Sequence, residues 1–248
     1  MIFQKVKKLV EEFRDRTERL NAQGNEILSQ QAELEWANIF QDTIKDKPWL
    51  TSLSLSPGRW AANYSLLYIL TRVLNDYQPK TVIEFGLGES SKLVDSFFSN
   101  SIRGGKHIVI EHDKNWTHHF QTRYPFQGPG QIIELELIQT SVKGFPVNSY
   151  KNVREVIGTT ADLYLIDGPF GSPRFSRYDI VLLAERFTST SEFVIILDDY
   201  NRQGEQNTIA ELLQVFKQKQ INIYTGEYRG RKTQMLLATE KYKYAASL

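Results

Sequence analysis

Apolar residues recur every three or four positions through the first 45 residues, a spacing that predicts helix. These positions are Ile2, Val6, Leu9, Val10, Phe13 and Leu20, followed by Ile27, Leu28, Leu34, Ile39 and Phe40. Charged side chains fill the other faces, and we expect a break near Gly24 and Asn25. We therefore predict that residues 1–47 form a helical extension. It would pack on the main domain, close over a site or join two copies in a homodimer.

After a linker marked by Pro48 and Pro57, short apolar runs alternate with amphipathic stretches. Strands are predicted at 81–85, 107–113, 132–138, 161–167 and 193–199, and a closing antiparallel pair at 221–228 and 232–239. Helices are predicted at 59–77, 90–99, 115–123, 176–187 and 206–219. Continuous apolar strands separated by helices are typical of a parallel sheet that is covered on both faces. The domain of residues 48–248 is thus predicted to be α/β, with a Rossmann-like, seven-stranded, mostly parallel sheet, helices on both faces and a C-terminal antiparallel strand pair.

Composition excludes several classes of function. The 248 residues carry a net charge of +1, so no overall field attracts nucleic acid, and we expect no nucleic-acid partner. The chain has no cysteine, which excludes disulfides, thiolate nucleophiles and zinc–thiolate sites. It contains no run of about 18 apolar residues that could span a bilayer, and its start does not resemble a signal peptide. We expect a cytoplasmic protein.

Acidic residues follow the predicted strands at the sheet edge where ligands bind in open α/β folds. They are Glu84, Glu111, Asp167, Asp198 and Asp199. A single carboxylate at a strand end can simply cap the next turn. Several of them at successive ends are typical of a functional site.

The first strand runs into a turn that contains Gly86 and Gly88. A dinucleotide-binding turn would have a third glycine near Ser91. It would also have no carboxylate at Glu84, because a pyrophosphate would be repelled there. A ligand with a cationic end is the better fit.

Four motifs resemble those of class I S-adenosylmethionine-dependent methyltransferases over about residues 58–240. They are EFGLGES after the first strand, the acidic end of VIEHD, LIDGP and ILDDY. The resemblance implies that the turn at Gly86 and Gly88 approaches the methionine part of the cofactor. Glu84 would hold its ammonium group, directly or through water, and Ser90 would add a hydroxyl.

The resemblance also implies where the rest of the cofactor lies. Glu111 would accept hydrogen bonds from both ribose hydroxyls, and His112 would lie against the adenine edge. Thr140 or Ser141 would reach the same ring.

The three aspartates should converge because the strands that carry them are neighbours in this fold. Three carboxylates this close repel one another unless a cation neutralises them, and oxygen ligands favour Mg²⁺. The layout of Asp167, Asp198 and Asp199 is similar to that of catechol-type and metal-dependent sugar O-methyltransferases. The resemblance implies a metal that lowers the pKa of a substrate hydroxyl. Proton removal would fall to Asp167, to Asp199 or to solvent, since no lysine stands at an obvious site.

Residues 56–64 and 169–179 are predicted to wall a substrate pocket. The candidate substrate contacts are Arg59, Trp60, Arg174, Arg177 and Tyr200. We predict a metal-assisted O-methyltransferase that acts on a sugar or another small polyhydroxylated molecule. The alternatives are a nicotinamide-dependent oxidoreductase, or a non-catalytic cofactor-binding or scaffolding protein of the same fold.

Overall fold

The computed structural model of the chain describes residues 2–100 and 104–248. A seven-stranded sheet forms the centre of the domain, with strand order β3-β2-β1-β6-β7-β9-β8. Its strands are β1 (Thr81–Phe85), β2 (Lys106–Glu111), β3 (Gly130–Glu134), β6 (Leu163–Ile166), β7 (Val194–Leu197), β8 (Tyr224–Arg229) and β9 (Thr233–Ala238). The first five are parallel, and β9 runs antiparallel to both β7 and β8. This confirms the predicted fold class.

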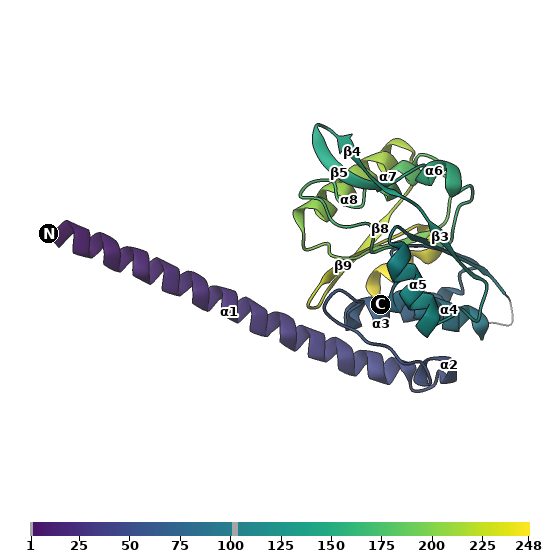
Figure 1. Cartoon of the computed structure of the whole chain (residues 1–248), viewed down its shortest axis with the longest axis horizontal. Helices are drawn as coiled ribbons and strands as arrows, with labels where there is room; N and C mark the ends of the chain where they lie inside the picture. Colours follow the sequence, from purple (N-terminus) through teal and green to yellow (C-terminus); the bar gives the residue numbers. More distant parts are fainter. Residues whose placement is uncertain (1, 101–103) are drawn as a thin grey trace.

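Helices cover both faces of the sheet (Figure 1). One face carries α3 (Tyr64–Tyr77), α4 (Glu89–Ser99) and α5 (Lys114–Arg123), and the other carries α6 (Val153–Val156), α7 (Asp179–Ala184) and α8 (Gln203–Gln218). The short α2 (Pro48–Thr51) and the 3-10 helix η1 (Glu240–Ser247) lie on the α3 side. Because both faces are covered, the central strands are buried and read as continuous apolar runs. Among the described residues, every helix is too short or too polar to cross a lipid bilayer.

The N-terminal extension is a single helix, α1 (Ile2–Ile44), whose N-terminal part projects away from the domain (Figure 1). It runs through Gly24 and Asn25 without interruption, so the predicted break is wrong. One glycine costs a helix only about 1 kcal/mol relative to alanine, and α1 contains no proline. At 1.5 Å per residue its 43 residues span about 65 Å.

The last turns of α1 belong to the domain core. The side chain of Phe40 is buried, and the Trp36 ring lies 5.2 Å from that of Tyr68. The Trp36 indole also donates a hydrogen bond to the carbonyl of Arg229, at 2.8 Å. The boundary at residue 47 stays a prediction, and these contacts favour a division inside α1.

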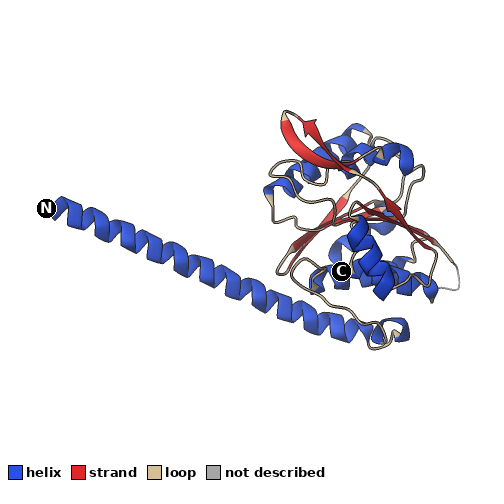
Figure 2. Cartoon of the chain, in the orientation of Figure 1, coloured by secondary structure: helices blue, strands red, loops and turns tan. Residues whose placement is uncertain are grey.

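Two local predictions are wrong for reasons visible in the backbone. The third strand ends at Glu134 rather than 138 because it pairs with β2, which itself ends at Glu111. The chain then leaves the sheet and forms a separate hairpin of β4 (Leu137–Val142) and β5 (Phe145–Tyr150), near α7 and α8 (Figure 2). The helix predicted from residue 59 begins only at Tyr64, since Gly58 and Arg59 adopt positive φ angles that a helix does not allow.

Candidate active site

The carboxyl ends of β1, β2, β6 and β7 open into one cavity of about 540 Å³. Its walls combine the glycine turn after β1, the loops after β6 and β7, and the turn between β8 and β9. The residues predicted from sequence that line it are Gly86, Gly88, Ser90, Glu111, His112, Asp167, Asp199, Arg59, Trp60 and Arg177. A single cavity therefore connects the predicted cofactor residues with the predicted acidic cluster.

Gly86 brings two loops into backbone contact. Its φ of +96° lies in the left-handed region, and a Cβ there would lie 3.2 Å from the carbonyl carbon of Asp167 and from the amide nitrogen of Gly168. Only glycine fits both constraints. The turn then leads into α4, whose first residues face the cavity and present backbone N–H groups that favour a negatively charged group.

Glu84 lies beneath the cavity rather than on its wall. Its carboxylate is fully buried, accepts a 2.5 Å hydrogen bond from the Ser90 hydroxyl and lies 2.9 Å from Nε2 of His107. Ser90, at the start of α4, does line the cavity. Glu84 is placed to orient Ser90, and its predicted contact with a ligand, directly or through water, stays a prediction.

Glu111 ties the end of β2 to the glycine turn. Its Oε1 accepts hydrogen bonds from the amides of His112 and Asp113, at 2.7 and 2.9 Å, and its Oε2 accepts one from the amide of Leu87, at 3.0 Å. The His112 ring packs edge-on against Phe170 at 4.8 Å, and both rings line the cavity. A carboxylate beside an aromatic wall fits a ribose and its attached base.

Tyr150 is a cavity residue that the sequence reasoning missed, because the β4–β5 hairpin was not predicted. Its side chain is buried, and its hydroxyl takes part in no hydrogen bond with any residue of the described ranges. Burial, followed by the nearby charges of Glu111 and Asp179, raises the pKa of this hydroxyl well above its usual value. A buried hydroxyl without a partner is available to a ligand. By contrast, Thr140 and Ser141 are exposed on β4 and lie off the cavity wall, so their expected adenine contact is wrong.

The three predicted aspartates do converge. One carboxylate oxygen from each of Asp167, Asp198 and Asp199 lies within 4.8 Å of the others. Asp198 is fully buried beneath the cavity, while Asp167 and Asp199 line it. Burial, then the charge of Asp198, raises the pKa of Asp167 well above its usual value.

Arg177 is a buried counter-ion of this cluster. Its Nη2 donates to Oδ2 of Asp199 at 2.7 Å and to Oδ1 of Asp167 at 3.1 Å, and its Nη1 donates to the carbonyl of Asp198 at 2.8 Å. The side chain is only 4% exposed. The Nη1 and Nη2 groups of Arg177 are used within the protein and its Nε lies 3.8 Å from Glu205, so the side chain is placed as a counter-ion rather than as the expected substrate contact.

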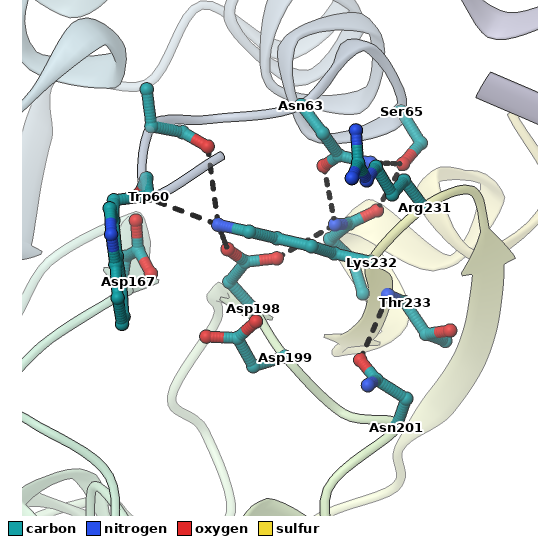
Figure 3. A network of polar contacts seen from close by, with 12 residues as sticks. Trp60, Asn63, Ser65, Asp167, Asp198, Asp199, Asn201, Arg231, Lys232 and Thr233 are labelled. Atoms are coloured by element: carbon teal, nitrogen blue, oxygen red, sulfur yellow. Dashed lines mark hydrogen bonds and ion pairs between the residues drawn. The ribbon is translucent and has the colours of Figure 1, made fainter. Parts of the chain in front are cut away.

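Lys232 is a second, largely buried cation of the cluster, supplied by the turn between β8 and β9 (Figure 3). Its Nζ lies 3.2 Å from Oδ2 of Asp198 and donates to the carbonyls of Ala61 and Trp60. Gln234 donates to the other oxygen of Asp198 at 2.7 Å. Burial opposes the charge on Asp198, but Lys232 and Arg177 outweigh it, so the pKa of Asp198 is lowered. Burial likewise opposes the charge on Lys232, but the aspartates raise its pKa.

The acidic cluster fits the oxygen chemistry of a hard divalent cation. Oδ2 of Asp167 and Oδ1 of Asp199 accept no hydrogen bond from the residues that the structure describes. Both carboxylate oxygens of Asp198 already have partners, Oδ2 the Lys232 ammonium and Oδ1 the Gln234 amide, so a metal there would compete with one of them.

The substrate wall is smaller than predicted. Arg59, the largely exposed Trp60 and Phe170 line the cavity. Arg174 and Tyr200 lie elsewhere: the Arg174 Nε donates to Asn207, and Tyr200 packs against the core. These two residues are not positioned as the sequence reasoning expected.

Comparison with known proteins gives structural matches. Neither the models of known protein families nor the sequences of curated proteins match this chain. A Klebsiella pneumoniae protein assigned as an O-methyltransferase superposes on 86% of this chain and 99% of its own, with a TM-score of 0.52 and 14% sequence identity. A Bacillus cereus O-methyltransferase bound to S-adenosylhomocysteine covers 84% of this chain and 91% of its own, with a TM-score of 0.46 and 11% identity. The Klebsiella match shows that the chain has the methyltransferase fold.

Proposed function

We propose that this chain is an S-adenosylmethionine-dependent O-methyltransferase that acts on a hydroxyl of a sugar or another small polyhydroxylated molecule. The observation that carries the proposal is the single cavity lined by both the glycine turn and the acidic cluster. It offers a place for the cofactor and a place for a nucleophile in one enclosed space, which is what direct methyl transfer requires.

The cofactor fits the half of the cavity that lies beside β1 and β2. The backbone at Gly86 and Gly88 leaves room for the methionine part, and Ser90 offers a hydroxyl held by Glu84. Glu111 receives the ribose, and His112 with Phe170 borders the base. The partnerless hydroxyl of Tyr150 supports this placement, because a bound cofactor would supply its missing hydrogen bond.

The substrate hydroxyl then lies at the acidic cluster. Its proton passes to the carboxylate of Asp167, the hydroxyl oxygen forms a bond to the sulfonium methyl, and the carbon–sulfur bond breaks to leave S-adenosylhomocysteine. The raised pKa of Asp167 makes its carboxylate the stronger base of the cluster. Lys232 and Arg177 hold the other carboxylates in place. Trp60 and Arg59 line the wall where a polar ring would pack.

A magnesium-assisted form of the proposal uses the same cluster differently, and the substrate proton would then pass to solvent because Asp167 would be a metal ligand. Asp167, Asp198 and Asp199 would hold the ion, with Lys232 or Gln234 displaced from Asp198. When bound, such a metal lowers the pKa of a coordinated hydroxyl. We also propose that two copies of the chain associate through α1, as its apolar pattern predicts.

Two measurements test the function. Calorimetry should detect S-adenosylhomocysteine binding, and formation of that product should be measurable with a panel of sugars and nucleotide sugars. Each substrate that is methylated is then assayed again in EDTA, with and without added Mg²⁺. Full activity in excess EDTA would refute the role of a metal but would leave the methyltransferase proposal standing. Absence of cofactor binding by the folded chain refutes the proposed function itself.

The variant Lys232→Met is the matched probe for the metal. If the lysine and the metal compete for Asp198, this variant should bind Mg²⁺ more tightly than the wild type does. If its Mg²⁺ affinity is unchanged, the two do not share the site.

A further inference from the structure

The exposed part of α1 carries an apolar repeat of seven residues. Val6, Phe13, Leu20, Ile27 and Leu34 follow one another at this fixed interval, and each is between 52% and 73% exposed. A helix that packs on a globular surface drifts from such a period, because its turn holds 3.6 residues. A strict heptad repeat instead matches a second helix that coils around the first.

The positions four residues after these are mostly small or polar. In heptad terms the repeat above occupies the d positions, and the a positions are Phe3, Val10, Thr17, Gly24 and Gln31. Large d residues alternate along the same face with the small Thr17 and Gly24. The face is therefore uneven, and it needs a partner whose large side chains fill its gaps.

We propose that this face pairs with the same face of a second copy, in antiparallel orientation, with Phe13 of one copy over Gly24 of the other. An antiparallel coiled coil sets each a position against a d position of its partner. With full overlap of residues 3–34, the layers pair Phe3 with Leu34, Val6 with Gln31, Val10 with Ile27, Phe13 with Gly24 and Thr17 with Leu20. Each gap then receives a large side chain, and a two-fold axis closes the assembly as a dimer.

Parallel pairing would be poorer on two counts. It sets Gly24 against Gly24 and Thr17 against Thr17, which leaves voids along the seam. It also aligns like charges. Residues 5–19 carry six Lys or Arg and four Asp or Glu, whereas residues 20–35 carry three Glu and no Lys or Arg. Antiparallel pairing places the net positive half of each helix beside the net negative half of the other.

A membrane surface fits this helix less well than a second copy does. Helices that bind anionic lipid are rich in Lys and Arg on their polar face. Over residues 2–44, α1 carries six Lys or Arg and eight Asp or Glu. Its apolar stripe is also narrow beyond residue 13, as in a coiled-coil seam rather than the broad face of a lipid-binding helix.

The oligomeric state of the full chain is the first test. Light scattering after size exclusion should give twice the mass of the chain, and Leu20→Glu should return it to a monomer. The matched control is Ala22→Glu, which adds the same charge on the opposite face and should leave the dimer intact. Both positions are exposed, so neither change should alter the melting temperature of the domain. A monomeric wild type at high micromolar concentration, or one that assembles only on added lipid vesicles, overturns the proposal.

The orientation is tested by disulfides, because the natural chain has no cysteine. On oxidation, Val10→Cys with Ile27→Cys in one chain should cross-link two copies, whereas Val10→Cys alone should not. In a parallel dimer, Val10→Cys alone would cross-link the two copies. Gly24→Leu completes the test: it should weaken an antiparallel dimer by about tenfold, since Phe13 then meets a filled site, but would strengthen a parallel one. Cross-linking by Val10→Cys alone, or a tighter Gly24→Leu dimer, refutes the antiparallel pairing.

Discussion

Glu33 connects the long helix to the candidate active site. Its Oε2 accepts hydrogen bonds from the side chain of Asn63 at 2.8 Å and from the amide of Arg231 at 2.9 Å. Its Oε1 accepts one from the amide of Tyr64 at 2.6 Å. Arg231 precedes Lys232 in the turn that reaches Asp198. One carboxylate on α1 therefore holds both the start of α3 and the turn that carries Lys232.

Replacing Glu33 by alanine removes all three bonds at once. At about 1 kcal/mol for each half-exposed hydrogen bond, the loss is about 3 kcal/mol of unfolding free energy. For a chain of this size, that corresponds to a fall of about 6–12 °C in melting temperature. Glu33→Gln keeps one carbonyl acceptor and the side-chain volume, so it should lose about half as much.

Thermal melting of both variants measures the stability, and methyl transfer at a temperature where both are folded measures the coupling to the site. We expect Glu33→Ala to lower turnover while cofactor affinity stays near that of the wild type, because Glu33 supports Lys232 and is remote from Glu111. A variant that melts like the wild type would show that these bonds contribute little. Normal turnover would show that Lys232 keeps its position without α1.

Three further predictions concern single groups. Glu111→Ala should weaken S-adenosylhomocysteine binding by about 1.5–3 kcal/mol in calorimetry, the range for hydrogen bonds to a charged group. An unchanged affinity would remove Glu111 from the site. Gly86→Ala should lower stability by about 1–2 kcal/mol for the left-handed backbone alone, measured by urea unfolding. Burial raises the pKa of Asp179 to about 6 from 3.8, so folding favours its protonated form and wild-type stability falls as pH rises from about 4 to 6. Relative to wild type, Asp179→Asn should therefore gain up to about 3 kcal/mol between pH 4 and pH 7, and a pH-independent difference would contradict this.

The sheet could be predicted from sequence because its signal is local. A strand covered on both faces, such as Leu163–Ile166, must be apolar at every position, so the run itself marks the strand. The ends of the strands depend on their neighbours and could not be predicted in the same way. Strand β3 stops where its neighbour β2 stops rather than where its own apolar residues do. The unbroken α1 was missed for a related reason: a single glycine weakens a helix without ending it.

The site could be predicted only where its residues follow strands directly. Asp167, Asp198 and Asp199 converge because the parallel register of β6 and β7 aligns their ends. Lys232 and Tyr150 could not be found this way. Lys232 reaches Asp198 across 34 residues through the antiparallel pairing of β7 and β9, and Tyr150 arrives on a hairpin outside the main sheet.

Three basic side chains beside the acidic cluster change the electrostatic argument that a metal must neutralise it. Asp167, Asp198, Asp199 and the buried Glu205 would together carry four negative charges, and Arg177, Lys232 and Arg202 carry three positive ones. Arg177 and Lys232 lie among the carboxylates and Arg202, 45% exposed, lies at their edge, so the protein alone can neutralise most of the cluster. With all four acids ionised, one negative charge would be left over, which would complement the positive charge of the proposed sulfonium cofactor.

Asp167 is the carboxylate of the cluster that most favours taking up a proton. Burial acts on both Asp167 and Asp198, but Lys232 and Arg177 together lower the pKa of Asp198, while burial and the charge of Asp198 raise that of Asp167. In the proposed reaction, a proton released by the substrate would therefore be taken up most favourably by Asp167. This proton would neutralise Asp167 in the same step in which the sulfonium loses its positive charge and becomes a neutral thioether. The net charge of the site would then stay the same. This balance is the physical reason to assign the base to Asp167, and Asp198 to the support of Lys232.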